Sequence, residues 1–201
     1  MLPKALENVV EALGVLPGVG PRTAERYATY LFRSDKTISN NISDALSKLH
    51  DGVKSCPKTF ALIDSSAEVS ELYSNPERDK KTVLVVEEPL DIYAIESTNS
   101  YKGTYHVLGG AVSPLDGISP EQLHIKELVK RVEEDGVLEI IIATNPSVEG
   151  ESTALFLQKT LSEKFPELKI TRLARGLPLG VDLSYADQIT LSAALNNRTD
   201  L

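Results

Sequence analysis

The spacing of apolar residues divides the chain into a helical first part and an alternating second part. Apolar side chains recur every three or four positions over residues 5–13 and 24–31, and a third helix is predicted over 39–49. From Lys80 onward, short apolar runs alternate with helical patterns. These runs predict strands at 82–87, 104–108, 138–143 and 169–173, and helices at 89–97, from Pro120, and at 152–164.

This alternation favours an α/β fold with a mostly parallel, helix-covered sheet. We predict four parts: an N-terminal helical region at 1–52, an irregular module at 53–79, the sheet domain at 80–173, and a C-terminal segment at 174–201. The last segment contains one short apolar helix at 186–195, which needs packing on its own domain or on a neighbouring subunit to be stable.

Composition is that of a soluble globular protein, with 41% hydrophobic and 25% charged residues. No apolar run approaches the roughly 20 residues that span a membrane, and the first residues lack the form of a signal peptide. The single cysteine, Cys56, cannot form an intramolecular disulfide. We therefore expect a cytoplasmic protein, associated with the nucleoid if it binds DNA.

Charge is distributed unevenly around a net value of −8. Residues 1–60 hold eight Lys and Arg against six Asp and Glu, whereas residues 61–201 hold 13 against 23. We expect nucleic acid to meet the first part, and proteins or a metal to meet the acidic remainder.

The turn Leu16-Pro17-Gly18-Val19-Gly20-Pro21 joins the first two helices and predicts a helix-hairpin-helix. Gly18 and Gly20 allow a tight turn whose backbone N–H groups can face a phosphate, and Arg22 and Arg26 lie one helical turn apart beyond it. Such contacts predict DNA binding that ignores sequence and weakens with salt. The alternative is a simple turn between helices with two solvated arginines.

Two predicted strands end in acidic loops that parallel pairing brings together. One ends at Glu87; the other leads into the segment 143–151, which contains Asn145, Glu149 and Glu151. The pattern resembles the Toprim domain of type IA topoisomerases and primases, in which carboxylates hold Mg²⁺. Asn145 and Ser147 stand where that domain has aspartates, so we predict a Toprim scaffold without its catalysis.

The module at 53–79 has the spacing of a paired C-x-x-C zinc site but retains one cysteine. Its four positions hold Cys56, Thr59, Ser70 and Tyr73. Zinc usually needs four thiolate or imidazole ligands. We therefore predict a metal-free module held by the packing of Phe60, Leu62, Leu72 and Tyr73.

Other enzymatic signatures are missing from the sequence. There is no G-x-x-x-x-G-K-[ST] motif, and the three histidines show no metal spacing. His106 lies on an apolar strand, where a hydrogen-bonded core histidine is the usual case. We predict no catalytic residues.

Taken in order, these motifs resemble the RecR family of bacterial recombination mediators over essentially the whole chain. The most specific segments are Tyr105-His106-Val107-Leu108-Gly109-Gly110, Ser113-Pro114-Leu115-Asp116-Gly117-Ile118 and Val148-Glu149-Gly150-Glu151. The resemblance implies a non-catalytic DNA repair protein that forms a ring-like homotetramer on DNA, works with RecO and RecF, and helps load the RecA recombinase.

The resemblance also implies roles for particular residues. It places DNA binding on Gly18, Gly20, Arg22 and Arg26, and partner binding on Glu87, Asp91, Asn145 and Glu149. It implies a degenerate zinc finger at 53–79, so the zinc of the family is not carried over and no cofactor is expected. The C-terminal segment at 174–201 becomes a candidate for oligomerisation.

Two rival functions remain open at this point. The first is a Mg²⁺-dependent nuclease or phosphotransferase that uses Glu87, Glu149 and Glu151, against which the neutral residues Asn145 and Ser147 argue. The second is a protein adaptor whose hairpin only packs and binds no DNA. We expect an oligomer because one hairpin offers few phosphate contacts and several around one duplex would multiply them.

Overall fold

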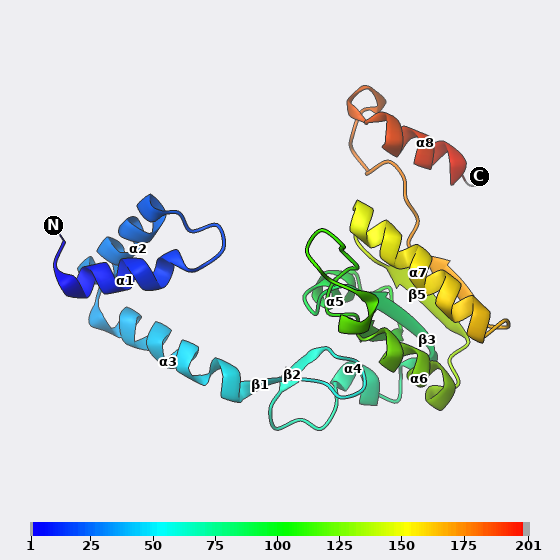
Figure 1. The fold of residues 1–201 in the computed structure, drawn as a ribbon, viewed down its shortest axis with the longest axis horizontal. Helices are drawn as coiled ribbons and strands as arrows, with labels where there is room; N and C mark the ends of the chain where they lie inside the picture. Colours follow the sequence, from blue (N-terminus) through cyan, green and yellow to red (C-terminus); the bar gives the residue numbers. More distant parts are fainter. Residues whose placement is uncertain (1, 199–201) are drawn as a thin grey trace. The chain divides into compact units, whose positions relative to one another are not determined.

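The computed structural model describes residues 2–198 of the chain, which divide into two compact units between Lys54 and Ser55 (Figure 1). The last three residues of the predicted C-terminal segment, 199–201, lie outside the described residues. The four-part division made from the sequence stays a prediction, because the two units are coarser than it.

The first unit contains three helices, α1 (Lys4–Gly14), α2 (Pro21–Arg33) and α3 (Lys36–Gly52). Ala24 and Ala28 are the buried residues of α2, and their small side chains let α1 and α2 pack closely. The Asp35 side chain accepts a hydrogen bond from the Thr37 backbone N–H at 2.8 Å and so caps α3. This cap explains why α3 begins before the predicted residue 39.

The second unit is built on a four-stranded parallel sheet in the order β4-β3-β5-β6. Its strands are β3 (Asp79–Val86), β4 (Gly103–Val107), β5 (Glu139–Ala143) and β6 (Lys169–Arg172). The predicted α/β fold is therefore confirmed. Val86 pairs with both Val107 and Ala143, so the carboxyl ends of the three strands lie level.

Alternate residues of the strands face two separate cores. Val83 and Val85 pack with Ile140, Ile142 and the apolar sides of α6 (Ile125–Asp135) and α7 (Val148–Lys164). On the opposite face, Leu84 and Val86 pack against α5 (Asp91–Glu96) and residues of the module. The central strands are apolar on both sides because helices or loops cover both faces (Figure 1).

The module at 53–79 is short and irregular, with β1 (Val53–Ser55), β2 (Leu62–Asp64) and α4 (Glu71–Ser74). Its Thr59 carbonyl accepts a hydrogen bond from the Val107 N–H at 2.8 Å, which satisfies backbone at the edge strand β4. The adjacent Phe60 stacks on the His124 ring, with centroids 3.7 Å apart.

Helices α6 and α7 begin four or five residues away from the predicted positions, and α5 begins two residues later than predicted. The capping box of Ser119 and Gln122 is present, but it starts the 3₁₀ turn η1 (Pro120–Gln122), and α6 begins only at Ile125. Helix α7 begins at Val148 and not at residue 152, because the Ser147 hydroxyl accepts a hydrogen bond from the Gly150 N–H at 3.0 Å. Glu149 and Glu151 therefore lie in the first turn of a helix.

The C-terminal segment contains the turn η2 (Leu183–Tyr185) and the helix α8 (Gln188–Asn196), which Asp187 caps. It presents large apolar side chains to solvent, among them Leu179, Leu183, Tyr185, Ile189 and Leu195. Within residues 2–198, no helix is both long and apolar enough to cross a bilayer.

Candidate functional site

The carboxyl ends of β3 and β5 are joined by Glu87 and Asn145. The Asn145 backbone N–H donates to one Glu87 carboxylate oxygen at 2.9 Å, and its side-chain amide donates to the other at 2.6 Å. Glu87 is 7% exposed, so these two bonds satisfy a carboxylate that water barely reaches. Hydrogen bonds to a charged acceptor are about twice as strong as neutral ones. The pair therefore fastens the two strand ends together.

Gly150, in the first turn of α7, completes this arrangement. A Cβ atom at Gly150 would lie 2.1 Å from the Asn145 carbonyl oxygen and 2.8 Å from a Glu87 carboxylate oxygen. Only glycine allows the helix to approach the pair this closely. The glycine at the centre of the Glu-Gly-Glu pattern is thus required by the packing of α7 against Asn145 and Glu87.

Glu151 is neutralised by two arginines. It pairs with Arg172 at 2.8 Å and with Arg175 at 2.6 Å. The Arg172 guanidinium holds the pKa of Glu151 below its usual value, and Arg175 acts in the same direction. Two of the three carboxylates that the rival enzyme would use are therefore engaged: Glu87 is bonded to Asn145 and Glu151 is paired with two arginines, which leaves Glu149 as the third.

The remaining predicted partner residue, Asp91, lies at the start of α5. Its carboxylate accepts a hydrogen bond from the Glu88 N–H at 2.9 Å, which orders the turn between β3 and α5. Asn145 is exposed, Asp91 and Glu149 are half-buried, and Glu88 is exposed. The face around these strand ends is therefore acidic and accessible, whereas Glu87 lies beneath it.

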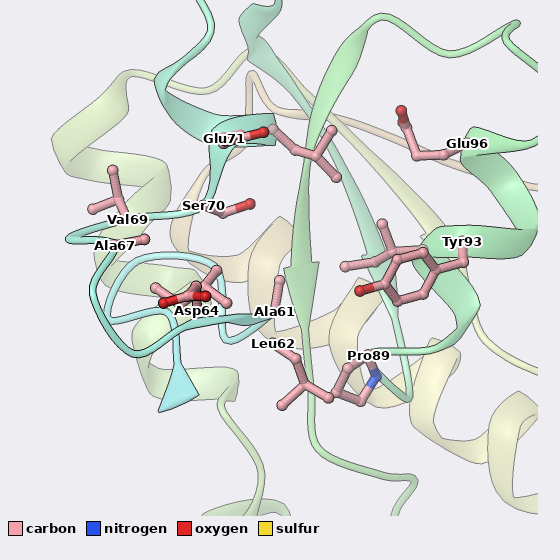
Figure 2. A pocket seen from close by; sticks show the side chains of 13 residues that line it. Ala61, Leu62, Asp64, Ala67, Val69, Ser70, Glu71, Pro89, Tyr93 and Glu96 are labelled. Carbon is pink, nitrogen blue, oxygen red and sulfur yellow. The ribbon is translucent and has the colours of Figure 1, made fainter. Parts of the chain in front are cut away.

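A cleft of about 390 Å³ opens between α5 and the module. Figure 2 shows Tyr93 and Glu96 of α5 on one side of it, and Ala67 and Val69 of the module on the other. Its lining is mostly apolar, with Leu62 and Tyr93 well exposed. No residue of this cleft is predicted from the sequence to contact a ligand.

The four zinc-type positions of the module, Cys56, Thr59, Ser70 and Tyr73, make contacts with other protein groups. The Cys56 sulfur accepts a hydrogen bond from the Ser70 N–H at 3.3 Å. Burial raises the pKa of the Cys56 thiol, but the hydrogen bonds that it accepts, first from the Thr59 hydroxyl, outweigh burial and leave that pKa below its usual value. One thiol among hydroxyl groups does not suit zinc. Across residues 2–198, no group of three or more His, Cys, Asp or Glu side chains is arranged to hold a metal ion.

The fourth position, Tyr73, points toward α6 instead. Its hydroxyl donates to the Asp135 carboxylate at 3.1 Å. Lys58 of the module pairs with Glu134 at 2.7 Å. The buried Arg131 donates to Asp135 at 3.1 Å and to Thr104 at 2.6 Å, and its guanidinium lies 5.2 Å from the centre of the Tyr73 ring. Polar contacts with α6 thus hold the module in place.

Packing of the module follows the prediction only in part. Leu72 and Phe60 contribute to the second core, whereas Leu62 is 45% exposed. The predicted core histidine, His106, is fully buried, and its Nε2–H donates to the His124 carbonyl at 2.8 Å. Its Nδ1 has no hydrogen-bond partner. Burial lowers the pKa of His106 to about 3, so the ring is neutral at physiological pH.

The hairpin residues lie together in the first unit. Gly18 has a φ of +77°, a left-handed conformation that favours glycine, and Gly20 is the N-cap of α2. Arg22 and Arg26 are both exposed on α2. With Tyr30 and Arg33 they border one shallow surface depression.

Sequence patterns alone do not identify several residues of these sites. Arg172 and Arg175 lie too far from Glu151 along the chain for any local spacing to reveal the pairing. Arg131 follows the pattern of an exposed helical charge and is nevertheless buried. Tyr30 and Arg33 do carry a usable signal, because they continue the helical face of Arg22 and Arg26.

Comparison with known proteins agrees with this arrangement. Family models match residues 6–50 (RecR, helix-hairpin-helix), 81–174 (Toprim domain) and 176–199 (RecR, C-terminal). Proteins named Recombination protein RecR are 45% identical in Rippkaea orientalis, 44% in Nocardia farcinica and 46% in Moorella thermoacetica. Each match covers at least 98% of this chain and at least 97% of the relative. The helix-hairpin-helix, the Toprim fold and this full-length similarity show that the chain belongs to the RecR family of recombination proteins.

Proposed function

We propose that this protein is a non-catalytic, DNA-binding mediator of recombinational repair. It assembles as a homotetrameric ring on DNA and, with RecO and RecF, helps load the RecA recombinase in the cytoplasm, at the nucleoid. Membership of the RecR family supports the setting in recombination. The remaining steps rest on the geometry of the hairpin and of the Toprim face.

The observation that carries DNA binding is the exposed arginine face of α2 beside the glycine turn. Gly18 and Gly20 keep the turn free of side chains, so a phosphate can approach the start of α2. Arg22 and Arg26 extend the contact along the sugar-phosphate backbone. Three arginines and one acid, Glu25, border the shallow depression on α2 in a chain whose net charge is −8, and the local excess of positive charge supports an anion-binding surface.

The absence of catalysis is supported by how the Toprim carboxylates are engaged. Two-metal or one-metal phosphoryl transfer needs several free anionic ligands in one cluster. Here Glu87 accepts both donors of Asn145, and Glu151 is paired with two arginines. These groups act in fastening strands and helices to one another, and we propose that the protein works without zinc or magnesium.

Oligomerisation is supported by the exposed apolar side chains of the C-terminal segment. Leu179, Tyr185 and Ile189 are each more than four-fifths exposed. Burial of such side chains between subunits is favourable by roughly 1.5–3 kcal/mol each. A ring then places several hairpins around one duplex and multiplies weak phosphate contacts.

We assign partner binding to the acidic face at the ends of β3 and β5. Asp91, Asn145 and Glu149 are accessible on it, and Glu87 holds Asn145 from beneath. An acidic face suits a basic surface on the partner. RecO is the partner that we propose for it.

The test is a DNA titration at several salt concentrations, with the mass measured by light scattering on the same sample. Replacing Arg22 and Arg26 with alanine should weaken binding and lower the salt slope by about one for each phosphate that the variant no longer neutralises. The matched control replaces Lys126 and Lys159, two exposed lysines of the acidic unit, and removes the same charge. It should leave the affinity unchanged.

Other outcomes would favour the rival functions. Mg²⁺-dependent cleavage of DNA that Glu87→Gln abolishes would identify an enzyme. If the DNA affinity and its salt dependence do not change when both arginines are replaced, the protein adaptor becomes the favoured function. A monomer at all concentrations would contradict the ring.

A further inference from the structure

The solvent-facing side of α2 carries more than the two arginines of the hairpin. At 100° per residue, Arg22, Arg26 and Arg33 lie within about 40° of one another around the helix axis, opposite the buried Ala24 and Ala28. They form a row about 16 Å long. A row of this length can follow several phosphates of a nucleic-acid strand.

Tyr30 lies beside this row, between its second and third arginines. It follows Arg26 by one helical turn and precedes Arg33 by about 4.5 Å along the axis. Its side chain is 61% exposed in the last turn of α2, and Tyr27 and Phe32 of the same helix are also exposed, at 43% and 81%. All four residues border the same shallow depression on the surface of α2.

Duplex DNA offers no unstacked base for the aromatic ring of Tyr30 to contact. The bases of a duplex are stacked on one another, and a helix that follows the backbone meets phosphates and sugars only. Proteins that bind single strands instead combine cationic side chains on the backbone with aromatic rings on which unpaired bases stack. The α2 row and Tyr30 supply both components.

We propose that Tyr30 is a stacking platform for an unpaired base, and that Arg22, Arg26 and Arg33 hold the phosphates on either side of it. This surface of α2 therefore prefers single-stranded DNA or the single-stranded part of a junction to a blunt duplex. This inference rests on the proposed DNA binding and adds to it the substrate class. Tyrosine stacks on every base, so the preference is for strandedness and is independent of sequence.

The first experiment compares affinities for a single-stranded oligonucleotide and for a duplex of equal length, with the mass of each variant measured by light scattering. Tyr30→Ala should weaken single-strand binding by about 5- to 150-fold, the range that stacking of one base supplies. Tyr30→Phe should retain it, because the ring remains. Tyr93→Ala is the matched control, since Tyr93 is 62% exposed and lies in the other unit.

A spectroscopic experiment reports the stacking directly. The chain contains no tryptophan, so Tyr30→Trp introduces a single indole at the proposed platform. Its fluorescence should be quenched by the single-stranded oligonucleotide and left nearly unchanged by the duplex. Tyr93→Trp should respond to neither.

Each contrary result has a distinct meaning. Equal losses for single strand and duplex, or no loss beyond that of Tyr93→Ala, would overturn the stacking role. If Tyr30→Ala forms an oligomer of a different mass from wild type, the Tyr30 side chain is a contact between subunits instead. A wild-type protein that binds neither DNA would remove the proposed DNA binding itself, whereas duplex binding without a Tyr30-dependent single-strand preference removes only this inference.

Discussion

Replacement of Asn145 by aspartate tests the pair that fastens β3 to β5. The substitution keeps the shape of the side chain but removes the amide that donates to Glu87 at 2.6 Å, leaving the backbone N–H at 2.9 Å as a donor. A hydrogen bond to a charged group contributes about 1.5–3 kcal/mol to stability. Two carboxylates would also face each other, with a repulsion of about 4 kcal/mol at 4 Å near a protein surface.

Most of that repulsion should be relieved. Asn145 is an exposed residue, so an aspartate there can turn into water. We expect Asn145→Asp to lower the free energy of unfolding by about 2–4 kcal/mol and Asn145→Ala by about 1.5–3 kcal/mol. Addition of Mg²⁺ should reduce the loss in free energy of unfolding for Asn145→Asp and not for Asn145→Ala, because only in the aspartate variant can a cation bridge two carboxylates.

Urea unfolding followed by circular dichroism measures these differences at neutral pH. Glu88→Gln provides the control, since Glu88 is the exposed neighbour of Glu87, and it should change stability by no more than about 0.5 kcal/mol. If both Asn145 variants also stay within about 0.5 kcal/mol of wild type, the pair contributes nothing to stability and the proposed fastening of β3 to β5 is refuted.

Three further predictions concern the buried groups. Gly150→Ala should destabilise the protein by about 1–3 kcal/mol in the same urea assay, because its Cβ meets the Asn145 carbonyl oxygen at 2.1 Å; wild-type stability would contradict the close approach. The folded protein keeps His106 neutral, with a pKa of about 3, so the unfolded chain binds more protons below its pKa of about 6.5. Stability should therefore fall as the pH drops from about 6.5 toward 3, by up to about 1.4 kcal/mol per unit, and His106→Gln should flatten this dependence; an equal slope in both proteins would argue against it. Chelation with EDTA should leave the melting temperature unchanged, because Cys56 bonds to Ser70 in place of a metal; a lower melting temperature would show a bound ion.

The periodicity of apolar residues is sufficient to predict those helices and strands whose sequence signals are local. The four strands and their parallel direction follow from apolar runs that alternate with helices. The closeness of Glu87 and Asn145 follows from the level ends of parallel strands. The predicted start of α7 is wrong because the Ser147 cap places the Glu-Gly-Glu pattern inside the helix, where a loop was expected. The capping box at Ser119 is confirmed, but it begins a 3₁₀ turn.

Long-range pairings leave no such local signal. Nothing near Arg131 in the sequence indicates that its guanidinium crosses to Thr104, since the two residues are 27 positions apart. The same holds for Tyr73. The sequence spacing places it at a position of a zinc site, but in the fold its hydroxyl bonds to Asp135, 62 positions away. Charge and spacing identify which residues are unusual, but only the packing decides their partners.

The attachment of the module to α6 has a consequence for how the protein opens. A metal-bound finger is a self-contained folding unit whose stability is set by its ion. Here Lys58 and Tyr73 are anchored on Glu134 and Asp135, and Phe60 stacks on His124. The module is therefore not stable by itself and should unfold together with α6. Its backbone amides should show the same protection from hydrogen exchange as those of α6. Anchoring on neighbouring side chains thus merges the module and α6 into one cooperative unit.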